Sequence, residues 1–231
     1  MGKRITQQAR GKGSLTFRVR RKAYRYKLGY PKLNETGKAK IIKLINSSGH
    51  SSPLAKVLIN NQVFFIPAVN KIYEGQEIEI YGKPENGNIL KLKEIPIGYR
   101  VCNIESVPGN GGVYSRSAGT SALITGKEQG KVEITINRRK IKLNENCRAL
   151  IGVVSGEGRL TKPMIKAGKK HYLMLSKGRK WHRTSAVKVN AVDHPFGSGR
   201  GKRIKSKIAK RNSPPGAKVG HLRPRKTGKK K

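Results

Sequence analysis

Short stretches in which apolar and polar residues alternate dominate this chain. In residues 131–136, Val132, Ile134 and Ile136 occupy every second position, which places them on one face of a β-strand. The alternation resumes at 141–143 after a break of four residues, so we expect a hairpin there.

Other segments predict strands for the same reason. Residues 77–80 and 90–92 alternate too, with the turn signal Asn86-Gly87 shortly before the second. Further strands are predicted at 39–45, 54–59, 62–66, 101–104, 122–125 and 149–154.

The spacing of these strands predicts a mainly β protein made of small barrels or sandwiches. No long helical period is present, and we expect only short helical turns, for example around 164–167. The irregular stretch 94–99, which contains Pro96 and Gly98, is where we expect one barrel to end and another to begin. Periodicity does not distinguish between barrel types.

Charge indicates what such a chain binds. It holds 52 Lys and Arg against 12 Asp and Glu in 231 residues, a formal net charge of +40. Residues 1–27 carry ten Lys or Arg and residues 197–231 carry fourteen, with no acid in either segment. This surplus repels itself unless a polyanion is present, and nucleic acid is the partner it favours. The two ends bury too little apolar surface to fold alone, so we expect extended tails.

Several classes of protein are disfavoured. The longest apolar run, 63–66, is too short for a membrane span, and the amino terminus lacks the apolar core of a secretory signal. An anionic membrane surface would call for a basic amphipathic helix or a lipidation motif, and neither is visible. Cys102 and Cys147 are too few for a disulfide framework or zinc ribbon, so we expect buried thiols in a reducing compartment. The histidines show no metal-ligand spacing.

Three segments are candidates for RNA contact, each with a bland alternative. Aromatic residues are scattered among arginines in residues 1–30, as suits base stacking, although a solvated arm would look similar. The glycine cluster 108–112 precedes Arg116 and permits close approach to phosphates, unless it is only a long turn. Trp181, flanked by cations, stacks on a nucleotide or closes the second barrel as a core residue.

Asp193, the only aspartate in the chain, precedes His194. Such a pair suggests a general base, and a rival interpretation is an RNA-modifying or hydrolytic enzyme that uses it with Cys102 or Cys147. Adjacency in sequence does not make two side chains face each other, so we favour a tight turn with His194 donating to RNA. A DNA architectural protein is a third interpretation, which the glycine loops and aromatics disfavour.

Motifs along nearly the whole chain resemble the universal large-subunit ribosomal protein L2 family, in its archaeal and eukaryotic cytosolic form. The matching stretches are His50-Ser-Ser-Pro-Leu-Ala-Lys56, Ile95-Pro-Ile-Gly98, Pro108-Gly-Asn-Gly-Gly112, Arg116-Ser-Ala-Gly-Thr120, Asn146-Cys-Arg-Ala149, Gly152-Val-Val154, Lys166-Ala-Gly-Lys169, Asn190-Ala-Val-Asp-His-Pro-Phe-Gly197 and Pro214-Pro-Gly-Ala-Lys-Val-Gly-His221. The chain departs from the family at 185–190, where an arginine and a glycine are missing, and at 197–203.

The resemblance implies a basic extension over 1–33, an OB-fold barrel over 34–93, an SH3-like barrel over 94–190 and a basic tail over 191–231. It also implies a cytoplasmic, non-enzymatic constituent of the large ribosomal subunit. Such a protein binds rRNA, lies beside neighbouring ribosomal proteins and supports subunit association, tRNA binding and peptide-bond formation, with the small subunit across the interface. Asp193 and His194 would support the peptidyl transferase centre, where RNA performs the chemistry.

We expect no cofactor, no metal, no membrane partner and no homo-oligomer. The predicted RNA contacts are Arg4, Arg10, Lys12, Arg18, Arg20, Arg21, Arg25, His50, Ser51, Arg116, Ser117, Arg148, Lys169, Arg179, Lys180, Trp181, Arg183, His194, Arg200, Lys202, Arg203, Lys205, Arg211, Lys218, His221, Arg223 and Arg225.

Overall fold

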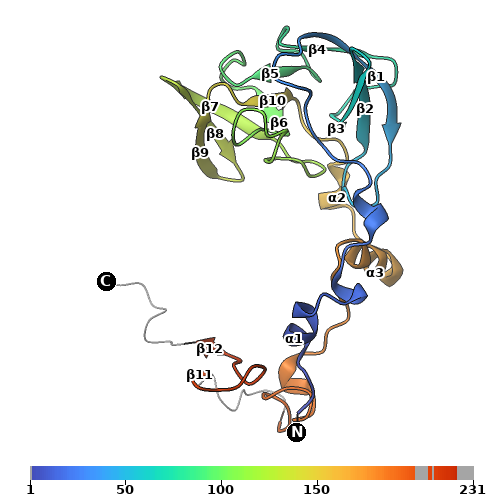
Figure 1. Ribbon diagram of the computed structural model, residues 1–231, viewed down its shortest axis with the longest axis vertical. Coiled ribbons are helices and arrows are strands. Elements are labelled where there is room, and N and C mark those ends of the chain that lie inside the picture. Colours follow the sequence, from blue (N-terminus) through green and yellow to red (C-terminus); the bar gives the residue numbers. More distant parts are fainter. Residues whose placement is uncertain (1, 201–207, 210, 223–231) are drawn as a thin grey trace. The chain divides into compact units, whose positions relative to one another are not determined.

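A computed structural model describes residues 2–200, 208–209 and 211–222, and it divides into two compact units. The β unit comprises residues 21–164. The arm unit comprises the described residues among 1–20 and 165–231. Figure 1 shows strands β1 to β10 in the first unit, and helices α1 and α3 in the second.

The described strands of the β unit form one ten-stranded sheet. Its order is β3-β2-β1-β4-β5-β10-β6-β7-β8-β9, antiparallel throughout except for the β4–β5 pair. The strands are β1 (Gly37–Ile45), β2 (Leu54–Ile59), β3 (Gln62–Pro67), β4 (Glu77–Ile80), β5 (Ile89–Lys91), β6 (Arg100–Cys102), β7 (Ala122–Glu128), β8 (Lys131–Ile136), β9 (Arg139–Asn144) and β10 (Arg148–Ile151).

Three central strands supply side chains to both hydrophobic cores of this unit. In β10, Leu150 packs into the core formed mainly by β1 to β4, whereas Ala149 and Ile151 pack into the core formed mainly by β6 to β9. Because successive side chains of a strand point to opposite faces, one strand serves two cores. The same division occurs in β5 and β6, with Ile89 opposed to Leu90 and Cys102 opposed to Val101.

The prediction of a mainly β protein is confirmed, and the sheet fits an OB-fold barrel joined to an SH3-like barrel. The hairpin of β8 and β9 is confirmed in register, with Ile134 opposite Ile141. Its two turn residues, Asn137 and Arg138, have φ of 46° and 68°, the left-handed conformation that tight hairpin turns require. β2 and β4 have the predicted bounds.

One helix is longer than the sequence predicts. The prediction of nothing longer than a turn around 164–167 is wrong, because α3 spans ten residues, Ala167–Ser176. Its residues include good helix formers, but none is buried, so no apolar stripe of helical period marks it in the sequence. The other helical segments are short: α1 (Thr6–Gly11), η1 (Leu15–Phe17), η2 (Arg21–Tyr24), α2 (Gly158–Thr161) and η3 (Ala186–Lys188).

Residues 165–190, predicted to lie in the second barrel, contain no strand and belong to the arm unit. A short parallel pair, β11 (Ile208–Ala209) with β12 (His221–Leu222), lies further along the same unit. The predicted boundaries at 33/34, 93/94 and 190/191 stay predictions. Within the described residues, none of the helices has the length and apolar character to cross a membrane.

Candidate nucleic-acid interface

Two loops of the β unit bring four predicted contacts together. The backbone N–H of Ala118 donates to Ser51 Oγ at 2.9 Å, which joins the loop before β2 to the loop before β7. We call His50, Ser51, Arg116 and Ser117 the loop surface. Ser51 and Ser117 are exposed, while His50 and Arg116 are half-buried. A hydrogen bond between residues 67 positions apart in sequence therefore brings the two loops into one site.

The packing of His50 sets its charge. Its Nδ1 lies 2.8 Å from Ser47 Oγ, and Tyr24 meets its ring edge-on with centroids 5.1 Å apart. Burial lowers the pKa of His50, and the positive charge of Arg116 lowers it further. His50 is therefore a neutral ring at pH 7, beside a cation that carries the charge of the loop surface.

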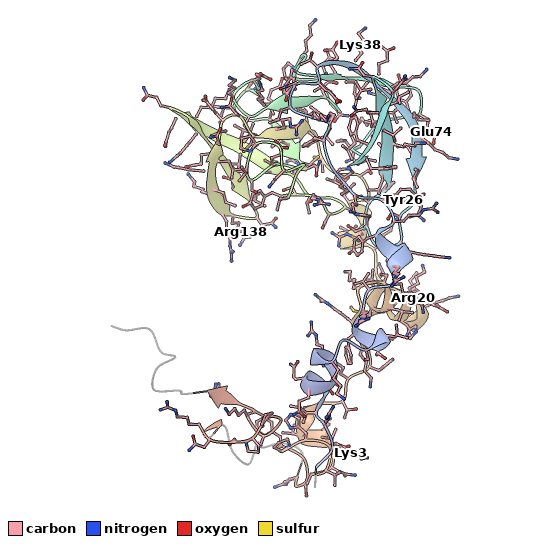
Figure 2. All side chains as sticks on the ribbon, viewed as in Figure 1. Lys3, Arg20, Tyr26, Lys38, Glu74 and Arg138 are labelled. Carbon is pink, nitrogen blue, oxygen red and sulfur yellow. The ribbon has the colours of Figure 1, made fainter. Side chains whose placement is uncertain are left out.

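A basic hollow of about 600 Å³ lies in the same unit. Tyr26 forms part of it and packs against Phe65, with centroids 4.9 Å apart, and Figure 2 shows the place of Tyr26 in the chain. The described residues that line the hollow include no carboxylate, so a phosphate there would meet cations, amides and hydroxyls. Its lining residues are Arg21, Lys22, Arg25, Tyr26, Asn46, Ser47 and Ser48.

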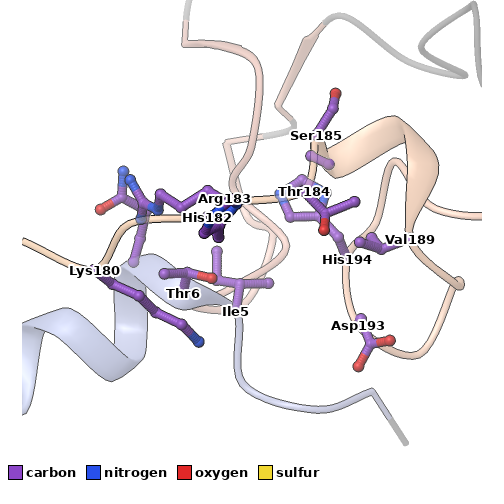
Figure 3. A pocket seen from close by; sticks show the side chains of 12 residues that line it. Ile5, Thr6, Lys180, His182, Arg183, Thr184, Ser185, Val189, Asp193 and His194 are labelled. Carbon is purple, nitrogen blue, oxygen red and sulfur yellow. The ribbon is translucent and has the colours of Figure 1, made fainter. Parts of the chain in front are cut away.

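In the arm unit, Asp193 and His194 lie on one tight turn but do not form a catalytic pair (Figure 3). The His194 Nδ1 accepts from the backbone N–H of Phe196 at 3.0 Å, and the Asp193 carboxylate lies 3.7 Å from Lys3 Nζ. A Cβ at Gly197 would collide with the carbonyl oxygen of Asn190, so this turn needs glycine there. The predicted turn is confirmed, and Asp193 does not orient the imidazole.

Both residues line a pocket of about 530 Å³ within the arm unit. Its other polar lining includes Lys180, His182 and Arg183, all from the segment after α3, and Thr6 from α1 (Figure 3). With Nδ1 occupied by a donor, the Nε2 atom of His194 carries the proton and can donate to a ligand. The pocket therefore combines cations with one imidazole donor.

Trp181 is half-exposed and belongs to neither core of the β unit, so the core-tryptophan alternative is wrong. Its ring lies 3.9 Å from that of His182 by centroids, and Lys170 Nζ lies 5.8 Å from its centroid. This leaves an aromatic surface among cations. Stacking on a base stays a prediction.

Comparison with known proteins identifies the family. The profile described as "Ribosomal Proteins L2, C-terminal domain" matches residues 85–216. The large ribosomal subunit protein uL2 of Archaeoglobus fulgidus is 43% identical over 240 residues, covering 99% of both chains. Those of Desulfurococcus amylolyticus (42%, 100% of both chains) and Methanococcoides burtonii (39%, 99% of this chain and 100% of the relative) match similarly. The chain belongs to the uL2 family.

One predicted contact of this uL2 chain is corrected by the structure. The Arg148 side chain is 1% exposed and its guanidinium is hydrogen-bonded to Glu105 and to the carbonyl oxygen of Pro31. It has no surface to offer RNA. Sequence reasoning missed this because a cation next to Cys147 looks like any other basic residue until Glu105, 43 positions earlier, is placed beside it.

Most other predicted contacts lie at the surface of the two uL2 units. Figure 2 shows nitrogen-tipped side chains projecting from both. Five predicted contacts, Lys202, Arg203, Lys205, Arg223 and Arg225, lie outside the described residues. The exposed ones are Arg4, Arg10, Lys12, Arg18, Arg20, Arg21, Arg25, Lys169, Arg179, Lys180, Arg183, Arg200, Arg211, Lys218 and His221.

Sequence reasoning also missed residues of the hollow, namely Lys22, Asn46, Ser47 and Ser48, although the lysine lies within a basic run that was visible. The enzyme interpretation required a reactive thiol. Both cysteines are free and buried, as predicted, and burial raises the pKa of Cys147 to about 11 and that of Cys102 further. Neither is a nucleophile at neutral pH.

Proposed function

We propose that this chain binds large-subunit rRNA as a structural constituent of the large ribosomal subunit. The relatives are large ribosomal subunit proteins by name, which fits a non-enzymatic role. The observation that carries the proposal is the exposure of most predicted cations among the described residues of both units, with Arg148 buried and Arg116 half-buried. Neighbouring ribosomal proteins and the small subunit would be further partners, in the cytoplasm, with the chain present as a single copy.

The geometry supports two kinds of RNA contact. The loop surface and the basic hollow offer cations on a preformed β framework, which suits a folded RNA with a defined arrangement of phosphates. The arm unit has 28 of the 52 Lys and Arg and a single acid, Asp193, which suits neutralisation of closely spaced phosphates.

For His194 we propose a supporting role near the peptidyl transferase centre, through which the chain aids subunit association, tRNA binding and peptide-bond formation. The acceptor role of Nδ1 toward Phe196 leaves Nε2–H to donate to an RNA oxygen. The partner of Asp193 is Lys3, so His194 lacks the carboxylate that a general base uses. The reaction itself belongs to the RNA.

Salt dependence of binding tests the proposal. If the chain neutralises about ten phosphates, the logarithm of its affinity for large-subunit rRNA falls with a slope of roughly −7 to −9 against log salt. Filter binding between about 0.1 and 0.5 M KCl measures this slope. Duplex DNA of random sequence is the comparison, and equal affinity for both would favour the architectural alternative. A slope near zero would remove the electrostatic basis of the proposal.

His194→Gln tests the finer role. Subunits reconstituted with this variant should assemble normally yet form peptide bonds more slowly, because glutamine cannot reproduce the fixed Nε2–H donor. His171→Gln, an exposed histidine of the same unit that is not among the predicted contacts, is the matched control and should leave the rate unchanged. Normal peptide-bond formation with His194→Gln would exclude the supporting role.

A further inference from the structure

A buried ion pair lies beneath the glycine cluster of the β unit. Glu105 follows β6 and is fully buried, and Arg148, the first residue of β10, is 1% exposed. Arg148 Nη2 donates to Glu105 Oε1 at 2.9 Å, and Nε lies 3.3 Å from both carboxylate oxygens. Although burial raises the pKa of Glu105, the hydrogen bonds from Arg148 and Gly111 lower it by more, so the carboxylate stays ionised.

The same carboxylate holds the glycine loop. Besides Arg148, it accepts from the backbone N–H groups of Gly109 at 3.2 Å and Gly111 at 2.9 Å. Gly109 and Gly111 have φ of 88° and 79°, which side chains rarely adopt. Glu105 therefore supplies acceptors to two amides of a turn that a backbone hydrogen bond from Asn110 N–H to the Val107 carbonyl oxygen also closes.

Arg148 anchors the other side of this loop. Its Nη1 donates to the carbonyl oxygen of Pro31 at 2.7 Å, and its guanidinium lies 5.1 Å from the Tyr30 ring centroid. A Cβ at Gly111 would lie only 3.1 Å from the Cα of Gly29, so the loop and the segment 29–31 are in close contact. One buried pair thus joins β10, the glycine loop and the chain that precedes β1.

The loop in turn orients a residue of the loop surface. The carbonyl oxygen of Gly112 accepts from Arg116 Nη1 at 3.1 Å, and Gly112 is the residue after Gly111, whose N–H Glu105 holds. This is the one hydrogen bond that the guanidinium makes within the described chain, so most of its five N–H donors are left for a ligand. Arg116 is thus hydrogen-bonded to the loop, and the loop is hydrogen-bonded to Glu105.

The contribution of such an ion pair to folding stability does not by itself explain its presence. Replacing a buried ion pair by apolar side chains of similar volume is often neutral or stabilising. Apolar side chains could not, however, accept hydrogen bonds from the backbone N–H groups of Gly109 and Gly111. These hydrogen bonds shape the loop. A loop shaped before binding loses less conformational freedom when RNA arrives.

We propose that Glu105 and Arg148 are positioning residues that hold the 108–112 loop, and through Gly112 the Arg116 guanidinium, in the RNA-binding arrangement before RNA is present. This inference rests on the proposed function. It assigns to two buried residues an effect on RNA binding that neither exerts by contact.

A double-mutant cycle on the full chain tests it. Glu105→Leu with Arg148→Met removes the pair and its acceptors, and Arg116→Ala removes the residue it orients. We expect E105L/R148M to weaken binding to large-subunit rRNA about tenfold, within the range of coupling between contacting residues. On the R116A background the same change should weaken binding less than about twofold. Equal weakening on both backgrounds, or no weakening on either, overturns the inference.

The matched control removes an exposed pair instead. Lys142 Nζ contacts Glu128 at 2.8 Å at the surface of the hairpin region, and E128L/K142M deletes one acid and one base as the test variant does. Its effect on RNA binding should be the same with or without Arg116. Coupling to Arg116 of the size expected for E105L/R148M would contradict the inference.

Hydrogen exchange supplies a readout that mere destabilisation would not give. The Gly109 and Gly111 amides should lose protection in E105L/R148M, while the amides between β8 and β9 keep theirs. Unchanged protection at Gly111 also overturns the inference.

If E105L/R148M does not fold, as judged by circular dichroism, Glu105→Gln takes its place in the cycle. The coupling should then be smaller, because one acceptor oxygen remains. If the wild-type chain itself shows no salt-dependent binding to large-subunit rRNA, the proposed function is refuted instead.

Discussion

The two units of the molecule differ most in how charge and apolar burial are shared. The β unit has 24 Lys and Arg against 11 acids and contains all the residues of both hydrophobic cores. The arm unit has 28 against one, and Ile5 is the buried hydrophobic residue among its described positions. Apolar burial stabilises the first unit without a partner, whereas the second has little to offset its own repulsion. We therefore expect binding and stability to respond to changes in different units.

Deleting residues 197–231 should produce the largest effect. It removes fourteen of the 52 cations but no residue of either core. If about half of the fourteen contact phosphates, the salt slope of rRNA binding becomes shallower by roughly 5. The melting temperature of the β unit, measured by circular dichroism, should stay within about 3 °C, because a ΔΔG of 1 kcal/mol shifts it by only a few degrees.

A chain with the same tail composition in shuffled order is the control for that deletion. It keeps the charge, so it should keep most of the salt slope. A marked fall in melting temperature on deletion would contradict the separation of roles between the two units.

Leu150→Ala should be the most damaging single change to the β unit. Leu150 is fully buried in β10, and truncating such a side chain costs about 2–5 kcal/mol. Urea unfolding measures this loss, and rRNA binding by the molecules that remain folded should change little. Leu15→Ala in the arm unit, where the side chain is 87% exposed, should stay within about 0.5 kcal/mol. An equal loss of unfolding free energy in both variants would contradict the difference in apolar burial between the two units.

Acid should weaken the β unit through Glu105. Because hydrogen bonds lower its pKa in the folded state, its contribution to stability is complete above the unfolded value of about 4.3 and is lost as pH falls through the folded value. One carboxylate can change the free energy of unfolding by at most about 1.4 kcal/mol per pH unit. Urea midpoints from pH 6 to 2 should fall less steeply for E105L/R148M than for wild type. Parallel curves would mean that other acids determine the acid response.

Asp193→Asn should have the smallest effect on stability. Its ion pair with Lys3 is exposed at both ends, and such pairs contribute at most about 1 kcal/mol. Exchange of the Lys3 amide, which donates to the carbonyl oxygen of Val192 at 2.7 Å, reports on this contact. Lys3→Gln is the matched variant and should behave alike. Loss of protection by more than tenfold in either would show that the exposed pair organises the turn.

The strands of this fold were accessible from sequence because their signal is local. Alternation with Ile134 and a turn at Asn137 is sufficient to identify a hairpin. The helix α3 escaped notice because it buries no residue and so shows no apolar period. At the candidate site, the exposed cations were predicted as a class. Arg148 was wrongly included, since its burial depends on Glu105, a partner that no local pattern reveals. At Arg148, a contact between residues distant in sequence determines whether the side chain is exposed.

The strands shared between the two cores limit how this molecule can be divided. A cut at the predicted 93/94 boundary would leave Leu150 on one fragment and most of the core it fills on the other. Leu90 would be separated from its neighbours in the second core in the same way. The two barrels are therefore not interchangeable modules. During synthesis, the first cannot complete its interior until the ribosome has translated β10, about 55 residues beyond that boundary.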